Sequence, residues 1–266
     1  MVKIAVAGAR GRMGSRIAAL SRESEGIELT GAFEVAGHPD VGKDLGDLFG
    51  VGRGARLSDS VEDVLDAADV VIDFTSPAST LANVQAAVRK GKAMVVGTTG
   101  FGVEELEEFR RHASMIPCVF AYNMSLGVNL LLKVLADVAR SLGDDYDVEI
   151  VEAHHRLKKD APSGTALALA RAIASALGRD LEKVGVFERK GMIGERSRKE
   201  IGIQTVRAGD IVGEHTVIFG GLGERVEIAH KASSRDTFAR GALRAALWLK
   251  GKPIGLHDMQ DVLGLK

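Results

Sequence analysis

The chain is poor in several residue types, and each shortage excludes a class of protein. Cys118 is the single cysteine among 266 residues, so no internal disulfide can form, and we expect a location in the reducing cytoplasm. One tryptophan and two tyrosines leave little aromatic surface for stacking single-stranded nucleic acid. The net charge of −1 provides no overall field that would attract nucleic acid.

Long hydrophobic runs are also missing. No apolar stretch approaches the roughly 20 residues that span a membrane, and the N-terminus enters a predicted strand directly, without a signal peptide. We therefore expect neither membrane nor nucleic acid among the partners. Hydrophobic residues still make up 45% of the chain, which is normal for a globular protein and excludes a disordered one.

The first half of the chain alternates strand-like and helix-like segments. Such alternation predicts right-handed βαβ units around a parallel sheet, and continuously apolar strands indicate that both sheet faces are covered. The predicted strands are 3–7, 29–33, 70–74, 93–96 and 117–121. The predicted helices are 13–23, 60–67, 79–90 and 103–113.

The pattern changes after Asn123, where we place a domain boundary. A long helix over 126–142, a strand over 146–153 and a helix from Ser163 come first. Strands follow at 201–208, 215–220 and 225–232, and their short connections predict antiparallel neighbours. A final helix covers 238–250. The predicted fold class is α/β, a Rossmann-like doubly wound parallel-sheet domain plus a smaller α+β domain with a mixed or antiparallel sheet.

A glycine-rich turn lies between the first predicted strand and the first predicted helix. Gly8, Gly11 and Gly14 allow a sharp turn and close approach of a pyrophosphate to the helix N-terminus, although the spacing departs from Gly-x-Gly-x-x-Gly. The turn alone is equally compatible with a plain strand-to-helix connection. Glu34 ends the second strand, where an acidic residue accepts hydrogen bonds from an adenosine ribose. Its alternative role is an exposed strand-end carboxylate, but together the features favour a dinucleotide.

Two other strand ends carry small polar residues. Gly97-Thr98-Thr99-Gly100 ends a later strand, and ligands of open α/β sheets bind outside the carboxyl ends of the strands. Small residues there would let the nicotinamide half of a cofactor lie against the backbone. Residues 73–77 lie at a similar strand end, and a helix cap by Thr75 or Ser76 is at least as good an interpretation as a ligand contact.

The segment 152–165 is rich in proton donors and cations. It reads Glu-Ala-His-His-Arg-Leu-Lys-Lys-Asp-Ala-Pro-Ser-Gly-Thr, and Ser163 is a good cap for the helix that follows. A helix N-terminus binds anions, carboxylates included. His154 and His155 should point to opposite sides of their strand, which argues against a metal, and we expect none. A solvated basic loop is the plainer alternative, but the convergence of these features favours a site for a small acidic substrate.

These motifs resemble the dihydrodipicolinate (4-hydroxy-tetrahydrodipicolinate) reductases of lysine biosynthesis. The resemblance runs along the whole chain in the family's order. The matching segments are Gly8–Gly14, Gly97–Gly100, Asn123–Asn129, Glu152–Thr165, Arg207–His215, Ser234–Ala239 and Asp258–Gly264.

The resemblance implies a reductase of a small cyclic dicarboxylate that uses NADH, NADPH or both and forms a homotetramer. It implies a dinucleotide-binding domain over 1–123 with a C-terminal return over 236–266, and a substrate-binding and oligomerisation domain over 124–235. His154 matches the family's proton donor/acceptor and Lys158 a second donor. The implied substrate contacts are His155, Gly164 and Thr165. The implied cofactor contacts are Gly8, Ala9, Arg10, Gly11, Arg12, Met13, Glu34, Gly97, Thr98, Thr99, Ala121, Tyr122, Asn123 and Met124.

Two other functions remain open at this point. A different two-domain dehydrogenase, acting on an amino acid or a semialdehyde, would share the glycine turn but would not need the segment 152–165. A non-catalytic dinucleotide sensor would keep the glycine turn and Glu34 but would not require His154 and Lys158. Oxidation of the cofactor with and without the cyclic substrate would separate these functions.

Overall fold

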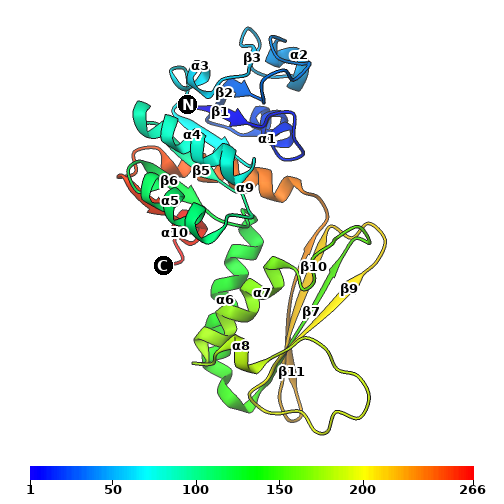
Figure 1. The fold of residues 1–266 in the computed structure, drawn as a ribbon. Coiled ribbons are helices and arrows are strands. Elements are labelled where there is room, and N and C mark those ends of the chain that lie inside the picture. Colours follow the sequence, from blue (N-terminus) through cyan, green and yellow to red (C-terminus); the bar gives the residue numbers. More distant parts are fainter. The chain divides into compact units, whose positions relative to one another are not determined.

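The computed structural model describes residues 1–266, and the chain divides into two compact units (Figure 1). Unit 1 comprises Met1–Leu126 and Asp236–Lys266, and unit 2 comprises Gly127–Arg235. The chain thus leaves unit 1 once and returns to it for the last part. No helix is both long and apolar enough to cross a membrane.

Unit 1 is built on a parallel sheet with the strand order β12-β6-β5-β4-β1-β2-β3. The strands are β1 Val2–Ala7, β2 Ile27–Phe33, β3 Leu57–Ser58, β4 Val70–Asp73, β5 Ala93–Val96, β6 Pro117–Phe120 and β12 Gly255–His257. The helices are α1 Gly14–Leu20, α2 Leu45–Phe49, α3 Val61–Leu65, α4 Pro77–Lys90, α5 Val103–Ala113, α9 Asp236–Leu249 and α10 Met259–Leu263, with a 3-10 turn at Ser21–Glu23. The predicted doubly wound parallel sheet is confirmed.

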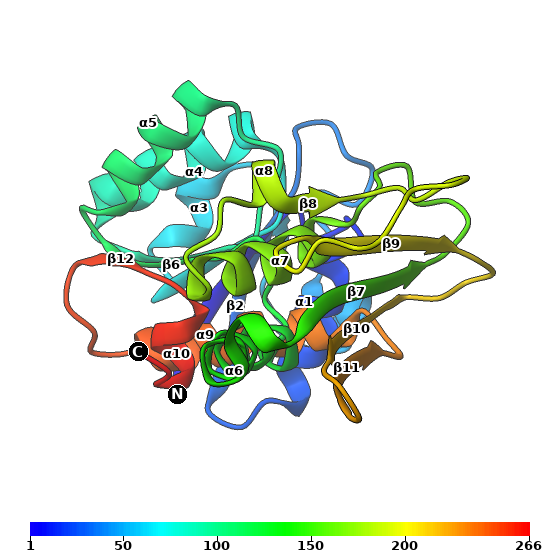
Figure 2. The same ribbon diagram turned by 90° about the horizontal axis from the view of Figure 1, so that it is seen from below.

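Helices cover both faces of this sheet (Figure 2). In β1, Ile4 and Val6 belong to the core under α1 and α9, whereas Ala5 and Ala7 belong to the core under α3, α4 and α5. Burial on both faces explains why the strands are apolar without alternation. Cys118 is fully buried in the second of these cores, and burial raises the pKa of its thiol.

Local signals explain where the longer helices of unit 1 begin and end. The Ser76 hydroxyl caps α4 by accepting a hydrogen bond from the Ser79 N–H, and Gly91 ends the helix with a φ of 60°. The helix-cap interpretation of residues 73–77 is therefore correct for Ser76. In α5, glutamates occupy the first turn and arginines the last, as the helix dipole favours.

The returning helix α9 packs closely on unit 1. A Cβ atom on Gly241 would lie 1.7 Å from the Met124 carbonyl oxygen, so only glycine permits this approach. Asp236 accepts two hydrogen bonds from Arg16 of α1, at 2.8 and 2.6 Å, and Arg240 donates to Glu23 at 2.8 Å. After α9 the chain adds β12 to the edge of the sheet beside β6, an element that the sequence analysis did not predict.

Unit 2 contains a mixed sheet with the strand order β11-β10-β7-β9-β8. The strands are β7 Asp147–His154, β8 Gly185–Val186, β9 Ile201–Arg207, β10 Gly213–Gly220 and β11 Arg225–Ala232. The helices are α6 Leu126–Leu142, α7 Gly164–Ala176 and α8 Leu181–Val184, with a 3-10 turn at Gly143–Asp145. Helices α6 and α7 pack on one face of this sheet, where the alternate residues of β7 are buried.

The expected antiparallel pairing of the strand at 201–208 with the strand at 215–220 is wrong. Strand β7 lies between them, parallel to β9 and antiparallel to β10. The segment that joins β9 to β10 passes the end of β7 and bonds to it, with Ala208 N–H donating to His154 O and Arg156 N–H donating to Gly209 O. These bonds replace the tight hairpin turn that the short connection suggested. The pairing of β10 with β11 is antiparallel, as predicted.

Candidate active site

The glycine turn of unit 1 is closely packed. Gly8 follows β1 with a φ of +58°, and the Gly11 N–H donates to its carbonyl oxygen at 2.9 Å. A Cβ atom on Gly14 would lie 2.2 Å from the Gly8 oxygen, so glycine is needed where α1 begins. Ala9 is buried, while Arg10 and Arg12 are exposed. The turn therefore presents backbone and two arginines at the carboxyl end of β1.

Glu34 lies beside this turn. Its carboxylate accepts hydrogen bonds from the Arg10 N–H at 2.9 Å and from the Val35 N–H at 3.1 Å. A carboxylate at this place, next to glycine-turn backbone, matches the donor and acceptor set that holds a dinucleotide. The Arg10 guanidinium is already engaged, since its Nε lies 2.7 Å from an Asp40 carboxylate oxygen, whereas Arg12 forms no ion pair within the structure.

A buried network of hydrogen bonds supports the turn after β5. Asp73, fully buried, accepts hydrogen bonds from the backbone and hydroxyl of Thr75 and from the side-chain amide of Asn83. Thr98 is buried and bonds to the Thr80 hydroxyl at 2.8 Å. The Thr98 side chain therefore supports the turn, and the exposed residue of the predicted pair is Thr99. This anchoring role of Asp73 was not predicted. The only signal in the sequence is the position of Asp73 between a buried strand and a threonine.

Residues 121–124 follow β6. A cavity of about 300 Å³ lies beside them at the carboxyl ends of β6 and β12, lined by Arg110, Phe120, Ala121, Tyr122, Leu256, His257 and Asp258. Tyr122 is exposed, but the Met124 side chain belongs to the core. Any contact between Met124 and a cofactor would therefore come from its backbone. The Asn123 side chain accepts a hydrogen bond from the Ser125 N–H at 2.8 Å.

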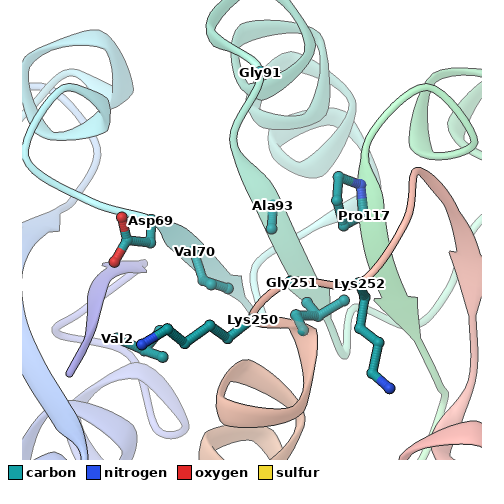
Figure 3. A pocket seen from close by; sticks show the side chains of 10 residues that line it. Val2, Asp69, Val70, Gly91, Ala93, Pro117, Lys250, Gly251 and Lys252 are labelled. Carbon is teal, nitrogen blue, oxygen red and sulfur yellow. The ribbon is translucent and has the colours of Figure 1, made fainter.

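A second cavity of about 300 Å³ lies at the other edge of the sheet (Figure 3). It is lined by the first residues of β1, β4, β5 and β6 and by the segment after α9 that contains Lys250 and Lys252. Because ligands of doubly wound sheets bind at the carboxyl ends of the strands, this cavity is on the wrong edge for the nucleotide.

In unit 2, His154 ends β7 and is buried. Its Nδ1 lies 2.5 Å from a carboxylate oxygen of Glu152, and its ring meets the ring of His215 edge-on, with centroids 5.2 Å apart. Burial lowers the pKa of His154, although the Glu152 carboxylate opposes that effect. The result is a histidine that is held in one orientation and is neutral at neutral pH.

The two lysines that follow differ in placement. The Lys158 side chain is largely buried and its ammonium lies 2.9 Å from a carboxylate oxygen of Asp160, while Lys159 is exposed. Asp160 therefore pairs with the lysine two positions before it. Lys158 also lies close enough to His154 for its positive charge to contribute to the lowered pKa of that ring.

The helix start at Ser163 is formed as predicted. The Ser163 hydroxyl accepts a hydrogen bond from the Ala166 N–H at 3.1 Å and caps α7, whose first residues are Gly164 and Thr165. Gly164 is exposed and nothing lies within 4 Å of the position that a Cβ would take, so this helix N-terminus is open to a ligand. The partly buried His155 lies on the segment between β7 and this helix.

Two further histidines, His215 and His230, lie on the strands beside β7 and β10. His215 is buried and bonds through Nε2 to the Ser163 hydroxyl at 3.1 Å, and burial lowers its pKa to about 4. It therefore connects the helix cap to the His154 ring. His230 lies opposite His215 on β11, and burial lowers its pKa as well.

A Rossmann-type sheet with a glycine-rich turn after its first strand, together with a second unit whose histidine and lysine precede an open helix N-terminus, is typical of an oxidoreductase that uses a nicotinamide dinucleotide. The family model described as "Dihydrodipicolinate reductase, N-terminus" matches residues 2–124, and the one described as "Dihydrodipicolinate reductase, C-terminus" matches residues 127–263. The chain belongs to the dihydrodipicolinate reductase family.

Individual relatives agree with this assignment. The 4-hydroxy-tetrahydrodipicolinate reductases of Syntrophobacter fumaroxidans and Syntrophus aciditrophicus are 59% and 54% identical to the chain, and each match covers 100% of both sequences. Among solved structures, the dipicolinate-bound dihydrodipicolinate reductase from Paenisporosarcina sp. TG-14 superposes with a TM-score of 0.77. It is 25% identical to the chain, and the match covers 98% of both chains.

Proposed function

We propose that the protein reduces 4-hydroxy-tetrahydrodipicolinate to tetrahydrodipicolinate, with loss of water, in lysine and diaminopimelate biosynthesis. The observation that carries the proposal is the segment from His154 to Thr165, which brings a buried histidine, a largely buried lysine and an open helix N-terminus together in unit 2. Full-length relatives named for this reaction support the substrate, as does the dipicolinate held by the related solved structure.

The substrate class follows from the charges of this segment. A cyclic dicarboxylate brings two negative charges, and the helix N-terminus at Gly164 and Thr165 offers N–H groups and the positive end of a helix dipole to one of them. The Lys158 ammonium offers a charge-assisted hydrogen bond to such a ligand in exchange for its bond to Asp160. We assign substrate contact to His155, Gly164 and Thr165 on this basis.

Loss of water from the substrate leaves a conjugated ring, and a bound nicotinamide cofactor would supply a hydride to that ring. The electron-rich product of that transfer needs a proton, and His154, once it has taken up a proton from solvent, supplies it directly or through Lys158. The lysine charge also stabilises negative charge that develops on the substrate. The His154 side chain is only 11% exposed. Bulk water is therefore excluded from the Nδ1 edge of the ring, which faces Glu152.

Unit 1 would hold the cofactor at the carboxyl ends of its strands. We propose contacts from the glycine turn, Glu34 and the turns after β5 and β6, which are the residues 8–13, 34, 97–99 and 121–124. Glu34 favours NADH because it accepts from ribose hydroxyls and would repel a 2′-phosphate. Arg12, exposed and outside any ion pair, is able to hold that phosphate, so we propose that both NADH and NADPH are used.

The face of the unit 2 sheet opposite α6 and α7 suits association of chains into the homotetramer that we propose for this cytoplasmic enzyme. A row of uncharged residues crosses this face from Gln204 through Val151 and Thr216 to Ala229. Two apolar side chains on the loops of unit 2, Met192 and Leu222, are fully exposed.

Association is tested by light scattering coupled to size exclusion. Val206→Lys introduces a charge on this sheet face and should reduce the mass of the particle, whereas Val103→Lys, at an exposed position of α5, should not. A wild-type particle with the mass of one chain contradicts the homotetramer.

The reaction is tested by supplying purified protein with the authentic cyclic substrate and following the nicotinamide absorbance. Oxidation of NADH or NADPH that depends on the substrate supports the proposal. Cofactor binding without any substrate-dependent oxidation would instead indicate a dinucleotide sensor. His154→Ala is the control for background oxidation.

A further inference from the structure

Glu152 is a fully buried carboxylate next to the proposed proton donor. It lies on β7 two positions before His154, so both side chains are on the face of the sheet that α6 and α7 cover. One of its oxygens is 2.5 Å from His154 Nδ1. Neither the glycine turn nor the helix N-terminus explains why a glutamate is buried here.

The negative charge of Glu152 is balanced on every side. Arg207 of β9 donates to its two oxygens at 2.9 and 2.8 Å, the Ser163 N–H donates at 3.0 Å and the Thr205 hydroxyl at 3.2 Å. Burial by itself would raise the pKa of Glu152, but the hydrogen bonds from Arg207, His154 and Ser163 outweigh it and lower the pKa to about 2. Glu152 is therefore ionised throughout the pH range in which enzymes work.

An ionised carboxylate only accepts hydrogen bonds, so the 2.5 Å contact requires a proton on His154 Nδ1. A neutral imidazole carries a single proton, which leaves Nε2 without one. The neighbour of Nε2 is Gly213, where an added Cβ would lie 3.1 Å from that nitrogen. The absence of a side chain at residue 213 keeps this edge of the ring clear.

We propose that Glu152 is a positioning residue, which holds the proton of neutral His154 on Nδ1 and so makes Nε2 the nitrogen that takes up a proton from solvent and then donates it to the substrate. This role rests on the proposed function, since it assumes that His154 transfers the proton. The same carboxylate bonds to the Ser163 N–H, so it also ties the proton donor to the start of the substrate-binding helix.

Glu152→Gln tests this role because it keeps the size of the side chain. The oxygen nearer Ser163 faces donors from Ser163, Thr205 and Arg207, so an amide would place its oxygen there. Its NH2 group would then point at His154 Nδ1 and donate to it. The neutral histidine would have to carry its proton on Nε2, which is the reverse of the wild-type arrangement.

Glu149→Gln is the matched control. Glu149 is on the same strand, on the opposite face of the sheet, and is bound by two arginines, Arg189 at 2.7 Å and Arg196 at 3.1 Å. Both substitutions remove, from β7, one carboxylate charge that is bound by arginine. Thermal unfolding and particle mass are measured for both variants, so that a loss of folding or association is recognised as such.

In the kinetic experiment, Glu152→Gln should lower kcat by about 10- to 100-fold, by analogy with the loss found when the partners that orient metal-bound histidines are replaced. The Michaelis constant for the cofactor should stay within about twofold, since that site is in unit 1. Glu149→Gln should retain kcat. Equal kcat for wild type and a folded Glu152→Gln variant would overturn the proposal.

The pH dependence separates positioning from a purely structural effect. The charged and titratable groups around His154 are Glu152 on β7, Lys158 on the next loop, Arg207 on β9 and His215 on β10. Among these, the Glu152 carboxylate raises the pKa of His154, so its removal should move the limb of the kcat profile that reports His154 to lower pH. An unchanged limb contradicts the proposal.

A measurement on the unmodified enzyme covers the case in which Glu152→Gln does not fold. Nitrogen-15 spectra of labelled histidines, assigned with His154→Asn, should show the Nδ1–H tautomer for neutral His154. Finding the Nε2–H tautomer there would refute the proposal. This result is independent of the reaction, so a protein with the Nδ1–H tautomer but no reductase activity would disprove the proposed function and leave the tautomer assignment standing.

Discussion

The neighbouring lysines Lys158 and Lys159 provide a sharp test of the candidate substrate site, because they share one chemistry and differ in placement. The Lys158 side chain is 21% exposed and its ammonium lies 2.9 Å from Asp160, while Lys159 is exposed. We consider Lys158→Met and Lys159→Met. Each removes one positive charge and keeps most of the apolar stem.

The expected loss for Lys158→Met follows from the bond that it removes. A hydrogen bond to a charged group contributes about 1.5–3 kcal/mol, and about 1.4 kcal/mol changes an equilibrium or a rate tenfold. Loss of one carboxylate contact should therefore lower kcat/KM for the dicarboxylate by between about 10- and about 150-fold. Lys159→Met should change kcat/KM by less than about twofold, since exposed charges in solvent contribute little.

The assay is steady-state oxidation of the cofactor at varied substrate concentration, with kcat and KM separated. Lys158→Met should raise KM for the substrate and lower kcat if the lysine also helps to deliver the proton. Asp160→Asn keeps the lysine and removes its partner, so it should retain most of the activity. Equal losses in the two lysine variants would refute the assignment of Lys158 as the lysine that contacts the substrate.

Three further outcomes are expected. His154→Ala should lower turnover by about 10²- to 10⁴-fold while cofactor affinity, measured by calorimetric titration, stays nearly constant; near wild-type turnover would remove His154 from the mechanism. Arg12→Ala should lose efficiency with NADPH more than with NADH, and more selectively than Arg10→Ala, whose guanidinium is held by an aspartate; equal losses with both cofactors in both variants would contradict a phosphate held by this turn. Gly97→Ala should lower the free energy of unfolding by about 1–3 kcal/mol, because the new Cβ would lie 2.1 Å from the Phe74 ring; an unchanged thermal midpoint would show that the ring moves aside freely.

The longer elements could be predicted from residue pattern because their determinants are local. The helix over 103–113 has acidic residues first and basic residues last, and the structure places α5 over the same residues. The long helix over 126–142 also agrees with α6. Short elements escaped prediction, among them α8 and β12, since a few residues carry too little periodicity to be distinguished from a turn.

Strand pairing depends on more than local pattern. The short connection between β9 and β10 suggested a hairpin, yet β7 lies between them. Both edges of β7 bond to neighbours, and its alternate residues Val148 and Ile150 are fully buried or nearly so. The central strand, β7, precedes both by about fifty residues. The sequence around β9 and β10 therefore carries no information about the strand that separates them.

In the candidate site, the two histidines, the paired lysines and the capped helix start could be predicted from the sequence alone, because they lie within one short segment. A serine directly before a helix most often caps it. Tertiary structure decided which lysine is sheltered and which groups surround His154. Glu152 meets Arg207 across 55 positions of the chain, and Ser163 meets His215 across 52. A buried carboxylate needs such partners to stay charged, and only the folding of β9 and β10 around β7 brings them within hydrogen-bonding distance.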